Sequence, residues 1–242
     1  MDLVIAHVSK DYGRGPVLRD VSLTVRQGET VCLMGPSGLG KTTLLRCVAG
    51  LERPESGSVT GVPERLGYVF QEDRLCGVFS AVANVRLATG RTLPEAEILR
   101  HLEELGLAGS ARRPVSQLSG GMRRRVAIAR AVCAGPRLLL LDEAFKGLDD
   151  QCRRDTVAYI RRHTPGASLL CVTHDPEEAL TLSDRVLIIE QGTISQYAKP
   201  EEIVHQPKND FVRKFILNQL EIKRNNIYAL FGDCPTWAVQ AG

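Results

Sequence analysis

The 242-residue sequence contains no long apolar run, because the best candidates, Leu138–Leu141 and Val186–Ile189, are each ended by an acidic residue. A helix that spans a bilayer needs about 20 apolar residues. The first residues, Met1–His7, also lack the basic segment and the long apolar segment of a secretory signal peptide. We therefore expect a protein with neither a membrane span nor an export signal.

The sequence also lacks an excess of charge of one sign, with 31 Lys and Arg against 28 Asp and Glu and a net charge of +3. Domains that bind nucleic acid are usually strongly basic on one face, so this balance argues against nucleic acid as the main partner. The seven cysteines contain no C-x-x-C pair, which argues against a disulfide framework or a zinc site. We interpret most of them as small core residues of a protein in a reducing compartment.

What the sequence does contain is an alternation of short apolar runs with helical patterns. Runs before residue 30, such as Val21–Val25, are typical of antiparallel strands separated by glycine turns. Later runs such as Val31–Met34 alternate with helical segments, which predicts a mostly parallel sheet with helices on both faces. Residues 71–135 show helical periodicity without a strand signal. The expected fold class is α/β, with an N-terminal antiparallel β subdomain and an inserted α-helical subdomain.

The strongest motif lies between an apolar strand and a helix and matches the phosphate-loop pattern G-x-x-x-x-G-K-[ST]. Its glycines allow backbone N–H groups to turn toward a phosphate, and the positive end of the following helix points to the same place. A glycine-rich structural turn is the alternative. Lys41 is expected to contact the β- and γ-phosphates, and the Thr42 hydroxyl to bind Mg²⁺. The predicted nucleotide-binding residues are Gly35, Pro36, Ser37, Gly38, Leu39, Gly40, Lys41, Thr42 and Thr43.

Two acids follow the apolar strand at residues 138–141. Residues at the carboxyl ends of strands lie at the edge of an α/β sheet where ligands bind. Asp142 is expected to hold Mg²⁺ through its water shell, and Glu143 to orient and polarise the attacking water. Alone, such acids are more often a helix cap, but together with the phosphate loop they indicate a P-loop NTPase core.

The sequence at residues 118–122, Leu-Ser-Gly-Gly-Met, resembles the signature motif of ABC-type ATPases. Serine and two glycines at a helix start also provide N–H groups for an anion. In that family the positions of Ser119, Gly120 and Gly121 contact the γ-phosphate of the ATP held by a partner subunit. The resemblance therefore implies a dimer of two copies that enclose ATP and Mg²⁺ between them.

The same resemblance assigns roles to residues elsewhere in the chain. Gln71 matches the glutamine that reaches Mg²⁺ and the attacking water, and His174 the histidine at the γ-phosphate, so both are expected to be catalytic. Asp149 matches an acid at the dimer interface, and Tyr12 an aromatic ring that stacks on adenine. By itself, a histidine after a strand is usually structural, and Tyr12 also fits as an ordinary strand or turn residue.

Some positions depart from the family pattern. Lys146 and Gly147 begin the loop before Asp149, where a small pair such as Ser-Ala is usual. The signature is followed by Arg123–Arg125, which could suggest nucleic-acid binding. Consecutive residues do not share one helix face, so we interpret these arginines as a solvated helix start.

A single cassette without a fused span resembles the separate ATPase subunit of a bacterial importer. The segment Phe70–Val85 resembles the nitrate, sulfonate and taurine branch, which has a Pro-Trp pair where this chain has Gly77 and Val78. The cassette resemblance covers residues 1–217, with the helical subdomain at about 71–135. Residues 218–242 form a tail with no assigned role, too short for the β-rich domain that sugar and polyamine subunits usually add.

The resemblance implies an ATPase that uses Mg²⁺ at the cytoplasmic face of a membrane, as a peripheral subunit. It would energise the import of a small solute, with an organic or inorganic anion such as sulfonate, nitrate or taurine as the best candidate. Its implied partners are ATP, a second copy of the chain, membrane permease subunits and a solute-binding protein. The alternative is a non-transport ABC ATPase of the DNA-repair or translation type.

Overall fold

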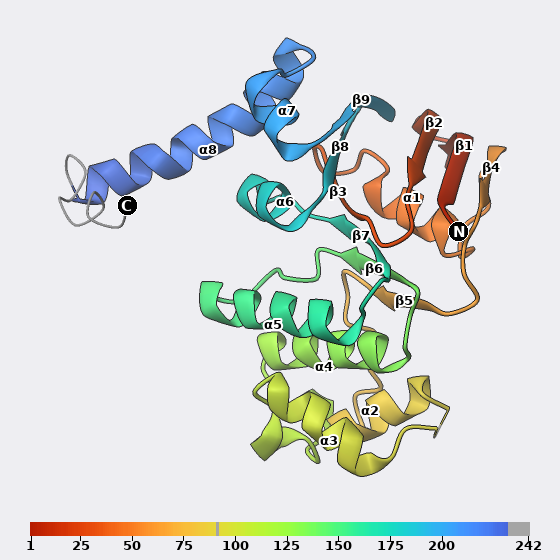
Figure 1. Ribbon diagram of the computed structural model, residues 1–242, viewed down its shortest axis with the longest axis vertical. Coiled ribbons are helices and arrows are strands. Elements are labelled where there is room, and N and C mark those ends of the chain that lie inside the picture. Colours follow the sequence, from red (N-terminus) through yellow and green to blue (C-terminus); the bar gives the residue numbers. More distant parts are fainter. Residues whose placement is uncertain (91, 232–242) are drawn as a thin grey trace.

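The amino-terminal apolar runs pair into a small antiparallel sheet, as the sequence predicts. The computed structural model, which describes residues 1–90 and 92–231, orders the strands of this sheet β2-β1-β4. Figure 1 shows the sheet beside the helix that follows the phosphate loop. The strands are β1 (Leu3–Asp11), β2 (Pro16–Val25) and β4 (Ser56–Thr60).

The remaining strands form a six-stranded sheet in the order β5-β6-β7-β3-β8-β9. All of its pairings are parallel except that of β8 with β9. Crossover helices connect the parallel strands, as their topology requires. The strands are β3 (Thr30–Met34), β5 (Leu66–Val69), β6 (Leu138–Asp142), β7 (Ser168–Val172), β8 (Arg185–Glu190) and β9 (Thr193–Ala198).

Helices cover both faces of this sheet, so the predicted α/β class is confirmed. Side chains alternate across a strand, and on β6 Leu138 and Leu140 face one apolar core while Leu139 and Leu141 face another. The first core includes α1 and the antiparallel sheet, and the second includes α4, α5 and α6. These helices are α1 (Lys41–Val48), α4 (Gly120–Cys133), α5 (Asp150–His163) and α6 (Pro176–Leu182).

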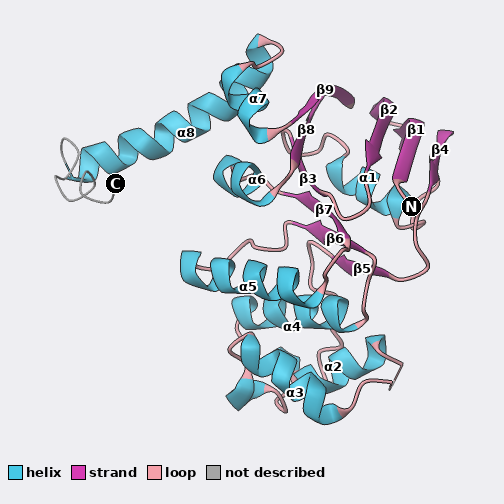
Figure 2. Ribbon diagram, in the orientation of Figure 1, coloured by secondary structure: helices cyan, strands magenta, loops and turns pink. Residues whose placement is uncertain are grey.

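The segment between β5 and β6 is a helical subdomain, as expected for residues 71–135, and Figure 2 shows its helices below the sheet. It consists of α2 (Ala81–Ala88), α3 (Glu95–Glu104), the short turns Ala108–Ser110 and Val115–Gln117, and α4. Its α4 packs against α2 within the subdomain and against β5 and α5 of the core. This helix therefore joins the insert to the sheet.

The chain continues through α7 (Pro200–His205) into α8 (Asp210–Phe231). The first part of α8 packs on α6 and α7 through the buried Val212 and Ile216, and Figure 1 shows the rest extending away from the body. A single helix thus crosses the expected boundary at residue 217, and residues 232–242 of the expected tail lie outside the described part. No helix within the described residues is long and apolar enough to cross a bilayer.

Candidate functional site

The phosphate-loop motif forms the turn between β3 and α1. Gly35, Gly38 and Gly40 have φ values of 146°, 81° and 82°, a region that side chains other than hydrogen disfavour. A Cβ on Gly40 would lie 2.4 Å from the Val17 carbonyl oxygen. Gly40 also gives α1 no side-chain cap, so the N–H groups at this helix end can bind an anion.

Lys41 folds back into this loop. Its side chain is buried, and Nζ donates hydrogen bonds to the carbonyl oxygens of Gly35 at 2.8 Å and Pro36 at 2.7 Å. Burial lowers the pKa of Lys41, while the charges of Glu143 and Asp142 act in the opposite direction. The loop therefore holds an ammonium group, with two carboxylates nearby, at the end of the sheet.

Asp142 ends β6 and is buried next to Thr42 of α1. The Thr42 Oγ1 donates to Asp142 Oδ1 at 3.1 Å, and the Tyr68 hydroxyl donates to Oδ2 at 3.5 Å. Burial raises the pKa of Asp142, and the hydrogen bond from Thr42 partly offsets it. A hydroxyl and a carboxylate are the hard oxygen ligands that Mg²⁺ takes together with phosphate and water, so the residues present fit this ion.

Glu143 lies next to Asp142 in a tight turn with a φ of 50°, which is uncommon for a residue with a side chain. Its Oε1 lies 2.7 Å from His174 Nε2, and its Oε2 accepts a hydrogen bond from Lys146 Nζ at 3.2 Å. Burial raises the pKa of Glu143, but the hydrogen bond from Lys146 and the positive groups nearby outweigh it and lower the pKa. The structure thus presents an ionised carboxylate beside the predicted metal site.

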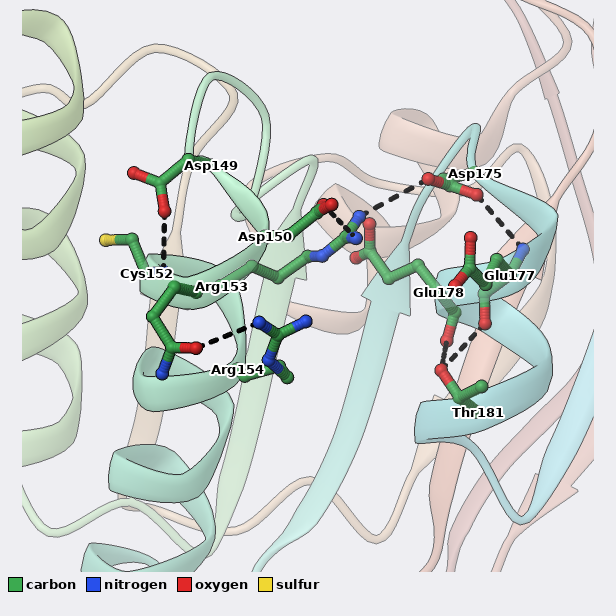
Figure 3. A network of polar contacts seen from close by, with 10 residues as sticks. Asp149, Asp150, Cys152, Arg153, Arg154, Asp175, Glu177, Glu178 and Thr181 are labelled. Carbon is green, nitrogen blue, oxygen red and sulfur yellow. Dashed lines mark hydrogen bonds and ion pairs between the residues drawn. The ribbon is translucent and has the colours of Figure 1, made fainter. Parts of the chain in front are cut away.

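A cleft of about 340 Å³ opens beside this pair and is lined by Glu143, Lys146, His174 and Arg153 among others. Figure 3 shows Arg153 of α5 reaching across to Asp175 at the start of α6. Its guanidinium donates to Asp175 at 3.3 Å and to Asp150 at 2.7 Å. Because Asp175 follows His174 directly, this contact ties the histidine segment to α5.

Gln71 lies after β5, where the chain enters the helical subdomain. Its side chain is exposed, and its carbonyl oxygen accepts a hydrogen bond from Arg124 at 2.6 Å. Arg124 also donates to the Phe70 carbonyl at 2.6 Å and is only 8% exposed. The prediction of a solvated helix start at residues 123–125 is therefore wrong for Arg124. The acceptors are main-chain carbonyls remote in sequence, which helical spacing could not reveal.

The signature residues begin α4. Ser119 caps this helix by accepting a hydrogen bond from the Met122 N–H at 3.3 Å, and Gly120 is exposed. A Cβ on Gly121 would lie 3.6 Å from the Gly147 carbonyl oxygen, so the motif lies against the loop that leads to Asp149. Asp149 in turn caps α5 by accepting from the Cys152 N–H at 2.9 Å (Figure 3).

Tyr12 follows β1 directly and is 49% exposed. The ammonium of Lys10 lies 5.2 Å from the centre of its ring, within the range of a cation–π contact. An exposed ring of this kind can stack on a planar base. The structure thus places the P-loop, Asp142, Glu143 and His174 at the sheet edge and the signature residues at the start of α4, whereas Tyr12, Gln71 and Asp149 lie on separate segments after β1, after β5 and before α5.

A family model described as ABC transporter matches residues 18–146, which include the phosphate loop, the signature and both acids. The chain belongs to the ABC transporter family. It is 41% identical over 237 residues to the sulfate/thiosulfate import ATP-binding protein CysA 2 of Rhizobium meliloti, covering 89% of this chain and 65% of that protein. The CysA protein of Brucella melitensis is 42% identical over 237 residues, with 89% and 66% covered.

Another relative is the spermidine/putrescine import ATP-binding protein PotA of Mesoplasma florum, 38% identical over 232 residues, with 88% of this chain and 66% of that protein covered. The chain thus spans slightly less than two thirds of the length of these relatives.

Solved ABC structures share the fold. The dimeric post-hydrolysis structure of the ATP-binding cassette MJ0796 with ADP and Pi has a TM-score of 0.75 and 27% identity, and covers 82% of this chain and 98% of that one. An ATP-bound bacterial Atm1-family ABC exporter has a TM-score of 0.81 and 23% identity, and covers 90% of this chain and 42% of that one. The match of the exporter shows the fold alone.

Two contacts of this ABC cassette were not found by sequence reasoning. Lys146 was identified as a departure from the family pattern, but its ion pair with Glu143 depends on the unusual backbone of that residue. Arg153 follows Asp150 at helical spacing, which predicts their contact. Its contact with Asp175 depends on how α5 and α6 pack, and no local signal reveals it.

Proposed function

We propose that this chain binds and hydrolyses ATP with Mg²⁺ as the ATP-binding subunit of an ABC importer. The observation that carries the proposal is the convergence of Lys41, Thr42, Asp142, Glu143 and His174 at the carboxyl edge of the sheet. In open α/β sheets ligands bind at this edge. Phosphate binding, metal binding and water activation each have a matching group there.

Each residue has a defined part in this chemistry. The N–H groups of the P-loop and the Lys41 ammonium hold the phosphates. Thr42, Asp142 and Gln71 would hold Mg²⁺, which when bound neutralises charge on the β- and γ-phosphates. Glu143 accepts a hydrogen bond from the attacking water and so fixes its direction of approach, while His174 holds the Glu143 carboxylate in place and faces the γ-phosphate.

A second copy of the chain would complete the site. Ser119 and Gly120 are exposed and Gly121 is half-buried at the start of α4, where the first N–H groups of a helix have no partner within it. Asp149 follows the loop that lies against Gly121. In the proposed dimer the three signature residues contact the ATP held by the partner's P-loop, and Asp149 lies at the interface between the two copies. The dimeric state of the MJ0796 cassette, at 27% identity, supports this arrangement.

We further propose that the imported solute is a small anion of the oxyanion type. The names of the Rhizobium meliloti and Brucella melitensis relatives, which refer to sulfate and thiosulfate import, support this class. The relatives compared do not support the narrower prediction of the nitrate, sulfonate and taurine branch, and one of them is named for spermidine and putrescine import. Their names as import proteins favour transport over the DNA-repair or translation alternative.

A permease would dock on the helical subdomain at the cytoplasmic face of the membrane, and a solute-binding protein would deliver the anion. A groove of about 360 Å³ on α2 is lined by Phe79, Arg86 and Leu87 among others. Phe79 is 45% and Leu87 is 59% exposed, and exposed apolar surface of this kind is typical of an interaction site. The helix α2 packs against α4, which carries Arg124, and Arg124 binds the main chain of Gln71.

Replacing Glu143 with Gln tests the ATPase proposal. We expect the E143Q variant to bind ATP with wild-type affinity, because the P-loop is intact, and to lose turnover by at least about 100-fold. Phosphate release and binding of a fluorescent ATP analogue measure the two properties, with the buffer lacking Mg²⁺ as a control. Turnover within about threefold of the wild type would contradict the assignment of Glu143.

The importer proposal needs its own measurement. Affinity capture of the tagged chain from detergent-solubilised membranes should recover an integral membrane protein, and capture of a variant with Phe79 and Leu87 replaced by Ser should recover less of it. Recovery of ribosomes or nucleic acid in place of a membrane protein would favour the non-transport alternative.

A further inference from the structure

Both oxygens of the Glu143 carboxylate are occupied within the chain. Oε1 contacts His174 Nε2 at 2.7 Å, and Oε2 contacts Lys146 Nζ at 3.2 Å. A carboxylate that orients water must offer an oxygen to a hydrogen bond from that water. A carboxylate oxygen has two lone pairs, so the water can reach Glu143 only at an oxygen that already has a partner. At Oε2 the water must share the oxygen with the Lys146 ammonium or displace it.

The backbone explains why Lys146 reaches this oxygen. The turn that begins at Glu143 brings the Lys146 N–H to 3.2 Å from the Glu143 carbonyl oxygen. The two side chains therefore leave the same tight turn and line the same cleft.

The two partners differ strongly in their surroundings. The side chain of Lys146 is 71% exposed, whereas that of Glu143 is 10% exposed. A flexible and hydrated lysine of this kind can leave its partner at low cost. The contact is therefore suited to holding Glu143 without blocking it permanently.

We propose that Lys146 is a positioning residue that restrains Glu143, holding its second oxygen until the attacking water replaces the ammonium. The inference rests on the proposed ATPase function, because it assigns Glu143 to water activation. Its consequence is that Lys146 lowers the basal rate of hydrolysis. A small residue at this position would leave Oε2 free.

The test compares three substitutions that treat length and charge separately. Lys146→Met keeps most of the length without the charge, Lys146→Gln keeps polarity without the charge, and Lys146→Arg keeps the charge. We expect K146M and K146Q to raise kcat for ATP about two- to fivefold, which at 1.36 kcal/mol per tenfold is about 0.4 to 1 kcal/mol. KM should change by less than about twofold, and K146R should resemble the wild type.

Salt supplies a readout that a purely structural role would not change. Raising the ionic strength from about 0.05 M to about 0.5 M shortens the screening length and weakens exposed ion pairs. The kcat of the wild type and of K146R should then rise toward that of K146M, measured under the same conditions. K146M itself reports any salt effect on the remaining steps.

The outcomes separate this inference from the proposed function. A kcat in folded K146M and K146Q that is equal to or lower than that of the wild type overturns the role of Lys146. A difference in kcat between the wild type and K146M that does not shrink at high salt overturns it as well. Turnover in E143Q within about threefold of the wild type overturns the assignment of Glu143 on which the inference rests, whereas no turnover in the wild type overturns the ATPase proposal itself. Loss of turnover in both E143Q and the double variant E143Q/K146M, together with faster K146M, supports both.

Discussion

Replacing Arg124 with Met should destabilise the protein more than its place on a polar helix start suggests. The guanidinium donates to two main-chain carbonyls, those of Phe70 and Gln71, both at 2.6 Å. It also lies 3.3 Å from Asp73. Its side chain is 10% exposed, so little solvent screens these contacts.

The magnitude follows from the number of bonds lost. A hydrogen bond that involves a charged group contributes about 1.5–3 kcal/mol. The two freed carbonyls lie in a loop and regain part of their hydration, so we expect R124M to lower the free energy of unfolding by about 2–4 kcal/mol. Arg124→Lys should recover only part of this loss, because a single ammonium does not reproduce the planar fork of arginine.

The assay is urea denaturation of the full chain, followed by circular dichroism, with the midpoint compared at unchanged slope. Arg154→Met is the matched control, because Arg154 is exposed and its guanidinium donates to Gln151 one helical turn away. A surface substitution of this kind changes stability by less than about 0.5 kcal/mol. If the free energy of unfolding of R124M lies within about 0.5 kcal/mol of that of R154M, the Arg124 guanidinium adds no stability and the argument from its contacts fails.

Two further predictions concern the edge of the sheet. Arg153→Met should lower kcat about three- to tenfold with little change in stability, because it removes the ion pair that ties Asp175, next to His174, to α5. Arg153→Lys should restore part of the rate. An unchanged kcat in R153M would refute a role of this ion pair in placing His174. Asp142→Asn should raise the urea midpoint at pH 7, because burial raises the pKa of this carboxyl, so its ionised form opposes folding above the unfolded pKa. The rise in urea midpoint of D142N over the wild type should shrink as the pH falls through the folded and then the unfolded pKa of Asp142. An equal rise at all pH values would show that the buried charge of Asp142 is not its cause.

Much of the fold could be predicted because apolar patterns and turn residues report local structure directly. The runs at β3 and β6 are strands buried on both faces, and the glycines of the P-loop mark a backbone that other residues disfavour. The helix α2 was not assigned, although Ser80 caps it through a hydrogen bond to the Ala83 N–H at 3.1 Å. Its short apolar stretch gave too little periodicity to recognise.

The site was predicted at the level of motifs and less well at the level of contacts. Motif spacing places Lys41, Asp142 and Glu143 at one sheet edge, because parallel strands end together there. The contacts of Arg124, which follows the signature, could not be predicted from motif spacing. Helical spacing predicts which residues share a face, but it does not predict that a carbonyl from the loop after β5 lies opposite that face.

The two apolar cores on opposite sides of β6 have a consequence for how this cassette tolerates change. The strand contributes side chains to both cores, since Leu138 and Leu140 pack into one and Leu139 and Leu141 into the other. Interiors packed at crystal-like density transmit volume changes to their neighbours. A substitution on α1 and one on α5 can therefore each displace the carboxylates that follow this strand. The position of Asp142 and Glu143 therefore depends on the packing of both apolar cores.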